Sequence, residues 1–177
     1  MIVKSLLKLI DEAIMPAAAL IIGKMLGLLL ASLYFQLPFT VQAGHFLKIL
    51  PAVEFANLKD YILAESYSNM GMFIAASLGT LLVIIQAHYF HESHIHPTLH
   101  AKLVALNLEN LVAPSYHLYH QAAIWLIFLW LTVGFLIIST VLGITYPYLA
   151  FIAFIVAANF SWVFAIDIER EIELSRN

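Results

Sequence analysis

The stretch AAIWLIFLWLTVGFLIISTVLGITYPYLAFIAFIVAANFSWVFAI, residues 122–166, decides the fold, because it contains no Asp, Glu, Lys or Arg. A membrane-spanning helix needs about 20 mostly apolar residues, so this stretch is long enough for two. Pro147 follows Ile144 and Thr145 and marks the start of the second helix. We therefore predict spans over 122–143 and 146–166, joined as a tight antiparallel hairpin.

Two further apolar stretches, over 13–37 and 70–90, meet the same length requirement. The chain has 177 residues, of which 63% are hydrophobic and 11% charged, whereas soluble proteins average roughly a quarter charged. We predict an all-α integral membrane protein with four transmembrane helices, forming a single membrane domain over residues 1–177 within a lipid bilayer. The net charge of −3 without a basic run argues against nucleic-acid binding. The absence of Cys excludes disulfides and thiolate metal ligands.

Amphipathic segments flank the expected spans. Residues 1–12 place apolar side chains on one helical face and charged ones on the other, which predicts an interfacial helix. The loops over 38–69 and 88–121 contain the stretches PAVEFANLKDYILAES (51–66) and TLHAKLVALNLENLV (98–112), which we expect to form helices on the membrane surface. The polar tail, 167–177, is expected to continue the fourth span as a short helix.

Four spans put both termini on the same side of the membrane. Cytoplasmic loops are enriched in Lys and Arg. The side of the termini has five such residues and the opposite side two: Lys4, Lys8, Lys102, Arg170 and Arg176 against Lys48 and Lys59. We therefore expect cytoplasmic termini, in a bacterial or other energy-transducing inner membrane.

Small residues recur at four-residue intervals on three of the spans, and such stripes predict close helix packing. They are Ala19, Gly23, Gly27 and Ala31 on the first span, Gly71, Ala75 and Gly79 on the second, and Ala153, Ala157 and Ser161 on the fourth. The third span has no comparable stripe and is rich in Trp and Phe. We expect more of its surface to face lipid or a large partner.

Lys24 is the costly residue of the first span, because a lysine near a helix centre is unfavourable by about 2.5–3.5 kcal/mol on insertion scales. Counting along the spans predicts that Lys24, Gln86 and Asn159 form a polar layer in the cytoplasmic half. No Asp or Glu lies in the core of an expected span. The layer would be an ion path or a salt-bridge site for a partner, or Lys24 would extend to the headgroups while Asn159 bonds a neighbouring helix. Asn159 points away from its stripe, which indicates a neighbour outside this chain.

Seven of the eight histidines lie between His88 and His120. His88 and His91 end the second span and His117 and His120 begin the third, so antiparallel packing would bring two pairs together as ligands of a transition metal or a surface haem. Further donors lie in the same loop: Glu92, His94, His96 and His100. The alternative is that these imidazoles occupy the membrane interface with the aromatic belt, or form a pH-dependent contact.

No nucleophile with a base, Gly-rich phosphate loop or carboxylate pair appears at informative spacing. We therefore expect an accessory or scaffold subunit of a larger membrane assembly, with other membrane subunits as partners, rather than an enzyme. Two alternatives stay open at this point. One is a His-ligated metal or haem protein using residues 88–120, and the other is a small transporter using a path around Lys24.

Overall fold

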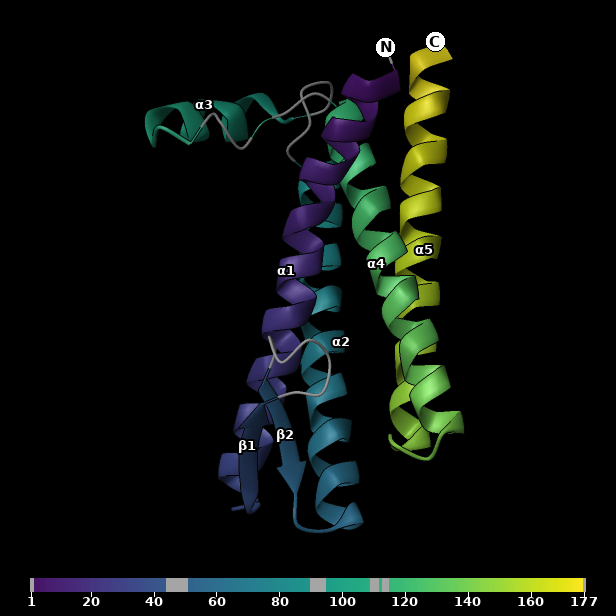
Figure 1. Ribbon diagram of the computed structural model, residues 1–177. Coiled ribbons are helices and arrows are strands. Elements are labelled where there is room, and N and C mark those ends of the chain that lie inside the picture. The colour runs from purple at the N-terminus through teal and green to yellow at the C-terminus, as the bar shows by residue number, and fades with distance from the viewer. Residues whose placement is uncertain (1, 44–50, 90–94, 109–111, 113–114, 177) are drawn as a thin grey trace.

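The computed structural model describes residues 2–43, 51–89, 95–108, 112 and 115–176. Within these ranges, only the backbone is described for residues 2–9, 42–43, 51–52, 115 and 174–176. The described chain is mostly helical (Figure 1).

The four long helices are α1 (Ile2–Tyr34), α2 (Leu58–Tyr89), α4 (Ser115–Val141) and α5 (Pro147–Arg176). Each is long and apolar enough to cross a membrane. The start of α1 and the end of α5 lie at the same end of the bundle (Figure 1). The predicted class, an all-α protein with four spans and both ends of the chain on one side, is therefore confirmed.

The helix boundaries differ from prediction in two places. The segment 1–12 is not a separate element, because α1 runs without interruption from Ile2 through Pro16 to Tyr34. The side chains predicted to form its apolar and charged faces belong mostly to residues 2–9, of which only the backbone is described. α2 begins at Leu58, well before the predicted residue 70, because Asn57 caps it. Asn57 Oδ1 accepts from the Asp60 backbone N–H at 2.9 Å, and Asn57 Nδ2 donates to Asp60 Oδ2 at 2.8 Å.

A two-stranded hairpin precedes α2. β1 (Phe39–Ala43) pairs antiparallel with β2 (Pro51–Phe55), with Thr40 opposite Glu54. The predicted surface helix over 51–66 is therefore wrong in its first part, and its second part belongs to α2. The apolar spacing of a short stretch fits a helix as well as a strand. Residues 51–55 form a strand because β1 provides partners for their backbone hydrogen bonds.

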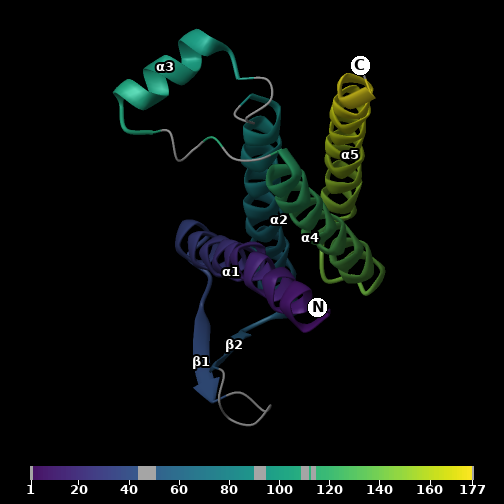
Figure 2. The same cartoon turned by 90° about the horizontal axis from the view of Figure 1, so that it is seen from above.

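The second predicted surface helix exists in shorter form. α3 (Pro97–Ala105) projects to the side of the bundle (Figures 1 and 2). It ends in a Schellman motif, in which Asn107 takes a positive φ of 54° and Leu108 N donates to Leu103 O at 2.8 Å. Residues 109–111 of the predicted stretch lie outside the described residues.

The turn between α4 and α5 explains the tight hairpin predicted there. Gly143 has φ +71°, a conformation that glycine adopts without strain. Its N–H donates to Thr140 O at 3.0 Å, and Ile144 N donates to Ser139 O at 2.9 Å, which completes another Schellman motif. Pro147 then begins α5, as predicted, and α5 continues through the polar tail to Arg176.

Glycines bring α1 and α2 into backbone contact. A Cβ added to Gly23 would lie 2.6 Å from Ala75 Cβ, and one added to Gly27 would lie 3.1 Å from Gly71 Cα. Ala31 is buried and Ala19 is half-buried. Gly23 and Gly27 of α1 thus pack against Gly71 and Ala75 of α2, which is the close approach that such stripes permit.

The hydrophobic core lies between α2, α4 and α5. Its large side chains come from α4 and its small ones from α2 and α5: Leu126, Leu129, Val133 and Leu136 against Ala76, Ala150, Ala153 and Ala157. In the 18-residue apolar stretch of each helix, 44% of the residues are buried in α4, against 11% in α1. The expectation that more of the third span than of the other spans faces lipid or a large partner is therefore wrong. It lacks a stripe because it supplies the bulky side that fills its neighbours' small-residue faces.

Candidate functional site

Two carboxylates tie His88, His117 and His120 to other helices, at the end of the bundle that holds both termini. Asp167 of α5 is the first: its Oδ1 lies 2.6 Å from His88 Nδ1 of α2. Its Oδ2 accepts from the Tyr119 hydroxyl of α4 at 3.0 Å. Asp167 therefore joins three helices.

Glu12 of α1 is the second carboxylate, and its side chain is only 10% exposed. Its Oε2 lies 3.0 Å from His120 Nε2, and its Oε1 lies 3.6 Å from His117 Nδ1. The other ring nitrogen of His117 lies 3.2 Å from Gln121 Nε2, and the Tyr116 ring stacks on His120. These contacts hold the beginning of α1 against the beginning of α4.

The described part of the predicted metal quartet is thus divided between two carboxylates, with His88 at Asp167 and His117 and His120 at Glu12. His91, Glu92 and His94 lie outside the described residues. His96 caps α3, where its Nδ1 accepts from Thr98 N at 3.4 Å, and His100 is exposed on the same helix. Among the described residues, no group of three or more His, Asp or Glu side chains is arranged to hold a metal ion.

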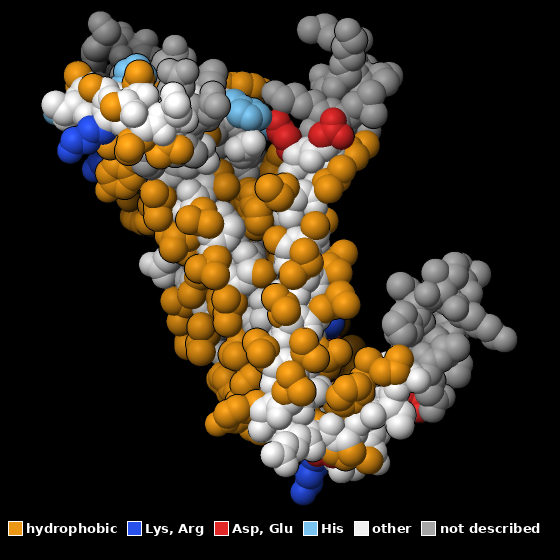
Figure 3. Space-filling model, turned by 90° about the vertical axis from the view of Figure 1, so that its left-hand side faces the viewer, with side chains coloured by type: hydrophobic (Ala, Val, Ile, Leu, Met, Phe, Trp, Pro, Cys, Tyr) orange, Lys and Arg blue, Asp and Glu red, His pale blue; other side chains and the backbone are white. Residues whose placement is uncertain are grey.

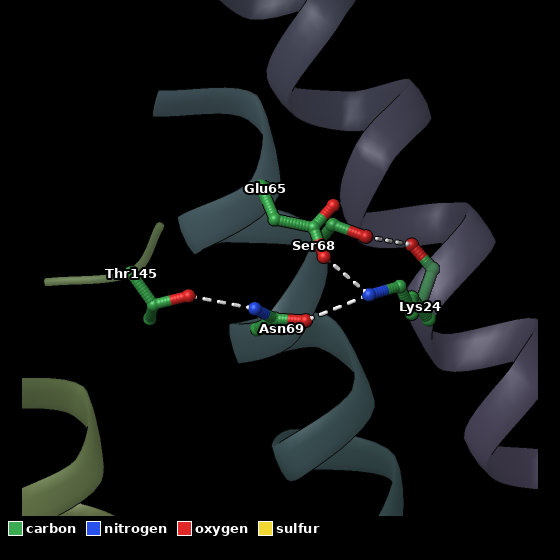
Figure 4. A network of polar contacts seen from close by, with 5 residues as sticks. All are labelled: Lys24, Glu65, Ser68, Asn69 and Thr145. Atoms are coloured by element: carbon green, nitrogen blue, oxygen red, sulfur yellow. Dashed lines mark hydrogen bonds and ion pairs between the residues drawn. The ribbon is translucent and has the colours of Figure 1, made fainter. Parts of the chain in front are cut away.

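A second polar site lies within the spans, around Lys24 (Figure 4). Lys24 Nζ donates to Glu65 Oε1 at 2.5 Å and to Asn69 Oδ1 at 2.9 Å. Ser68 Oγ donates to the Lys24 backbone oxygen at 2.9 Å. Asn69 Nδ2 donates to Thr145 Oγ1, in the turn before α5, at 2.7 Å. Lys24 is therefore neutralised within its own chain.

This network links α1, α2 and the α4–α5 turn. Tyr146 N donates to Ser66 Oγ at 3.3 Å, and Lys24 Nζ lies 4.9 Å from the centre of the Phe135 ring. Asn69, Ser66 and Ser68 are buried. Buried polar groups are stabilising when each finds a partner, and this network supplies those partners across three segments.

The predicted polar layer of Lys24, Gln86 and Asn159 does not form. Gln86 lies on α2 about 26 Å beyond Asn69 at 1.5 Å per residue, and it lines a cavity beside Glu12. Asn159 is exposed on α5, where its Nδ2 donates to Ile155 O at 2.7 Å. The layer was mispredicted because α2 was assumed to begin at residue 70, which placed Glu65 and Asn69 in a loop.

Sequence reasoning missed three of the residues that organise these sites: Glu12, Glu65 and Asn69. Glu65 and Asn69 are spaced four apart and share one face of α2. Once Asn57 and Asp60 are taken as a helix cap, that spacing shows a polar face within a spanning helix, which needs a polar partner.

The small residues also position aromatic side chains. A Cβ on Gly79 would collide with the Trp125 ring, so this glycine seats the indole against α2. Ser161 Oγ of α5 accepts from Trp130 Nε1 at 2.9 Å. The small-residue stripes of α2 and α5 therefore each contact a tryptophan side chain of α4.

No family model, curated protein or solved structure significantly matches this chain.

Proposed function

We propose that this protein is an accessory or scaffold subunit of a larger multi-subunit membrane assembly. The observation that carries the proposal is the outward-facing Asn159. It lies about 18 Å along α5 from Pro147, near the middle of a span that runs from Pro147 to Glu173. Its amide is exposed rather than directed at α4.

An amide in hydrocarbon is costly, and one hydrogen bond to its own helix leaves it able to make others. Side-chain hydrogen bonds between spanning helices contribute about 0.6–2 kcal/mol each. The neighbouring Trp162 is 71% exposed and provides a large apolar surface beside it. An amide next to a large aromatic surface suits a helix of another subunit better than it suits lipid alone.

The ionisable groups support a structural role. Lys24, His88, His117 and His120 each contact a carboxylate on a different helix. Side chains that hold helices together in this way stabilise an arrangement, and catalysis would require them to face a substrate instead.

The test is recovery of companion subunits from the native host after gentle solubilisation, measured by native mass spectrometry. We expect companions in fixed ratio with the wild-type chain, and roughly 3- to 30-fold weaker recovery with Asn159→Leu, the range expected for one interhelical hydrogen bond. The matched control is Phe151→Leu, an exposed apolar position about two helical turns before Asn159 on α5, which changes apolar surface without removing a hydrogen-bonding group. A lone wild-type chain, or equal recovery with Asn159→Leu, would contradict the proposal.

We further propose that both termini are cytoplasmic, in a bacterial or other energy-transducing inner membrane. The support is the excess of Lys and Arg at the end of the bundle that holds the termini. Reporter fusions at residue 177, active only on one side of the membrane, test this directly. A periplasmic signal there would reverse the orientation.

A further inference from the structure

Six residues on the outer side of α5 follow a heptad repeat. They recur at alternating intervals of four and three residues, and all of them are exposed: Tyr148, Ile152, Ile155, Asn159, Trp162 and Ile166. We call these six residues the α5 seam. Side chains at such intervals form a narrow line along a helix, which is the pattern that pairs two helices in a coiled coil and in many membrane bundles.

The α5 seam lies opposite the contacts that α5 makes within its own chain. The side of α5 that packs in the core consists of small buried residues: Ala150, Ala153 and Ala157. Because successive residues of a helix are rotated by about 100°, these alanines project to the side of the helix away from the seam. A second helix can therefore pack on the α5 seam without disturbing the core.

Asn159 is the polar member of the α5 seam. The heptad spacing places it with Ile152 and Ile166 at the a positions, and the other three seam residues at the d positions. On the face drawn in Figure 3, hydrophobic side chains cover the middle of the bundle and most charged side chains lie toward its two ends. An exposed amide near the middle of a span departs from that pattern. A single Asn at an a position fixes the register and the number of helices in a coiled coil.

We propose that a second copy of this chain covers the α5 seam, with the two α5 helices parallel. The inference rests on the proposed function, whose partner at Asn159 it identifies. The Lys and Arg bias orients every copy of a chain alike in the membrane. A two-fold axis along the membrane normal therefore sets each a residue opposite the same residue of the second copy.

The amide is complementary to itself under this symmetry. An Asn side chain both donates and accepts, so Asn159 pairs with Asn159 of the second copy at the same depth. A helix of a different subunit would need a polar group of its own at that depth. The apolar seam residues gain little from leaving lipid, because lipid tails are as apolar as they are. The amide pair therefore provides the drive and the register for pairing.

The first test is disulfide cross-linking of single-cysteine variants of the full chain, which contains no Cys of its own. The purified chain is oxidised in detergent, and the dimer is measured on a non-reducing gel. Ile155→Cys lies in the α5 seam. Phe154→Cys is the matched control, because it is exposed at nearly the same depth but points about 100° away. A disulfide needs Cα atoms within about 7 Å, so Ile155→Cys is expected to cross-link roughly tenfold faster or more.

The second test removes the amide and measures dimerisation of the purified chain as it is diluted in detergent. Asn159→Leu is expected to dimerise roughly 3- to 30-fold more weakly, the range for one interhelical hydrogen bond. Asn159→Gln keeps an amide and is expected to retain most of the dimer. A monomeric wild-type chain, equal cross-linking of the two cysteine variants, or unchanged dimerisation of Asn159→Leu would overturn the proposal.

The subunit role and the pairing can fail separately. Companion subunits recovered with a single copy of this chain in each assembly would support the subunit role and overturn the pairing. A purified chain that cross-links along the α5 seam but has no companions in its host would support the pairing and overturn the subunit role.

Discussion

The interface of α1 and α2 gives the sharpest test of the packing, through Gly27→Ala. A Cβ on Gly27 would lie 2.5 Å from the Tyr67 backbone oxygen, 3.0 Å from Ser68 Cα and 3.1 Å from Gly71 Cα. All three atoms are backbone atoms and cannot rotate away. The two helices must separate, so the substitution is expected to destabilise the protein even though it adds only one methyl group.

The magnitude follows from two opposing effects. Overpacking a well-packed site costs about 1–3 kcal/mol, and contacts with backbone place Gly27→Ala in the upper half of that range. Replacing glycine by alanine inside a helix returns about 0.5–1 kcal/mol. The net loss is therefore about 1–2.5 kcal/mol. Gly134 is the matched control, because a Cβ there has no neighbour within 4 Å, so Gly134→Ala is expected to gain up to about 0.5–1 kcal/mol.

The assay is reversible unfolding in mixed micelles with increasing SDS, followed by circular dichroism, with both variants measured beside the wild type. The free energies of unfolding of the two variants should differ by about 2–3 kcal/mol, with Gly27→Ala the less stable. If Gly27→Ala were as stable as Gly134→Ala, α1 and α2 would not be in backbone contact at this point, and the small-residue interface would be wrong.

Three further predictions concern the turn, the hairpin and the ion pair. Gln36 lies two residues after the end of α1 and has φ 52°, so Gln36→Gly is expected to raise the free energy of unfolding by about 0.5–1 kcal/mol, while Gln36→Ala gains nothing. Equal effects of the two substitutions would contradict this conformation. In the Cys-free chain, Thr40→Cys with Glu54→Cys should cross-link far faster than a pair offset by one residue, and equal rates would refute the strand register. Glu65→Gln is expected to lower stability by about 2 kcal/mol, less than for a fully buried pair because the Lys24 side chain is 34% exposed, and the loss should shrink when Lys24→Met is also present. Additive losses in that double variant would argue against the ion pair.

Local signals predicted most of the helical architecture. Apolar length placed the four spans, and Pro147 located the start of α5. These features depend on a helix satisfying its own backbone hydrogen bonds, which each segment does without reference to the others. The hairpin of β1 and β2 did not follow from such signals, because a strand needs a partner for its hydrogen bonds.

What the sequence by itself determined is therefore the class of the protein, the number of its spans and the small-residue faces that pack. Only the tertiary structure decided which polar groups meet. Lys24 binds Glu65 and Asn69 rather than Gln86. His117 and His120 contact Glu12, whereas His88 contacts Asp167. The physical reason is that an ion pair or hydrogen bond forms within about 3 Å, so placing the start of α2 at residue 70 instead of Leu58 left Glu65 and Asn69 outside the span and Lys24 without its partners. Predicting a span from the length of an apolar stretch tolerates such an error, whereas predicting which charged groups pair does not.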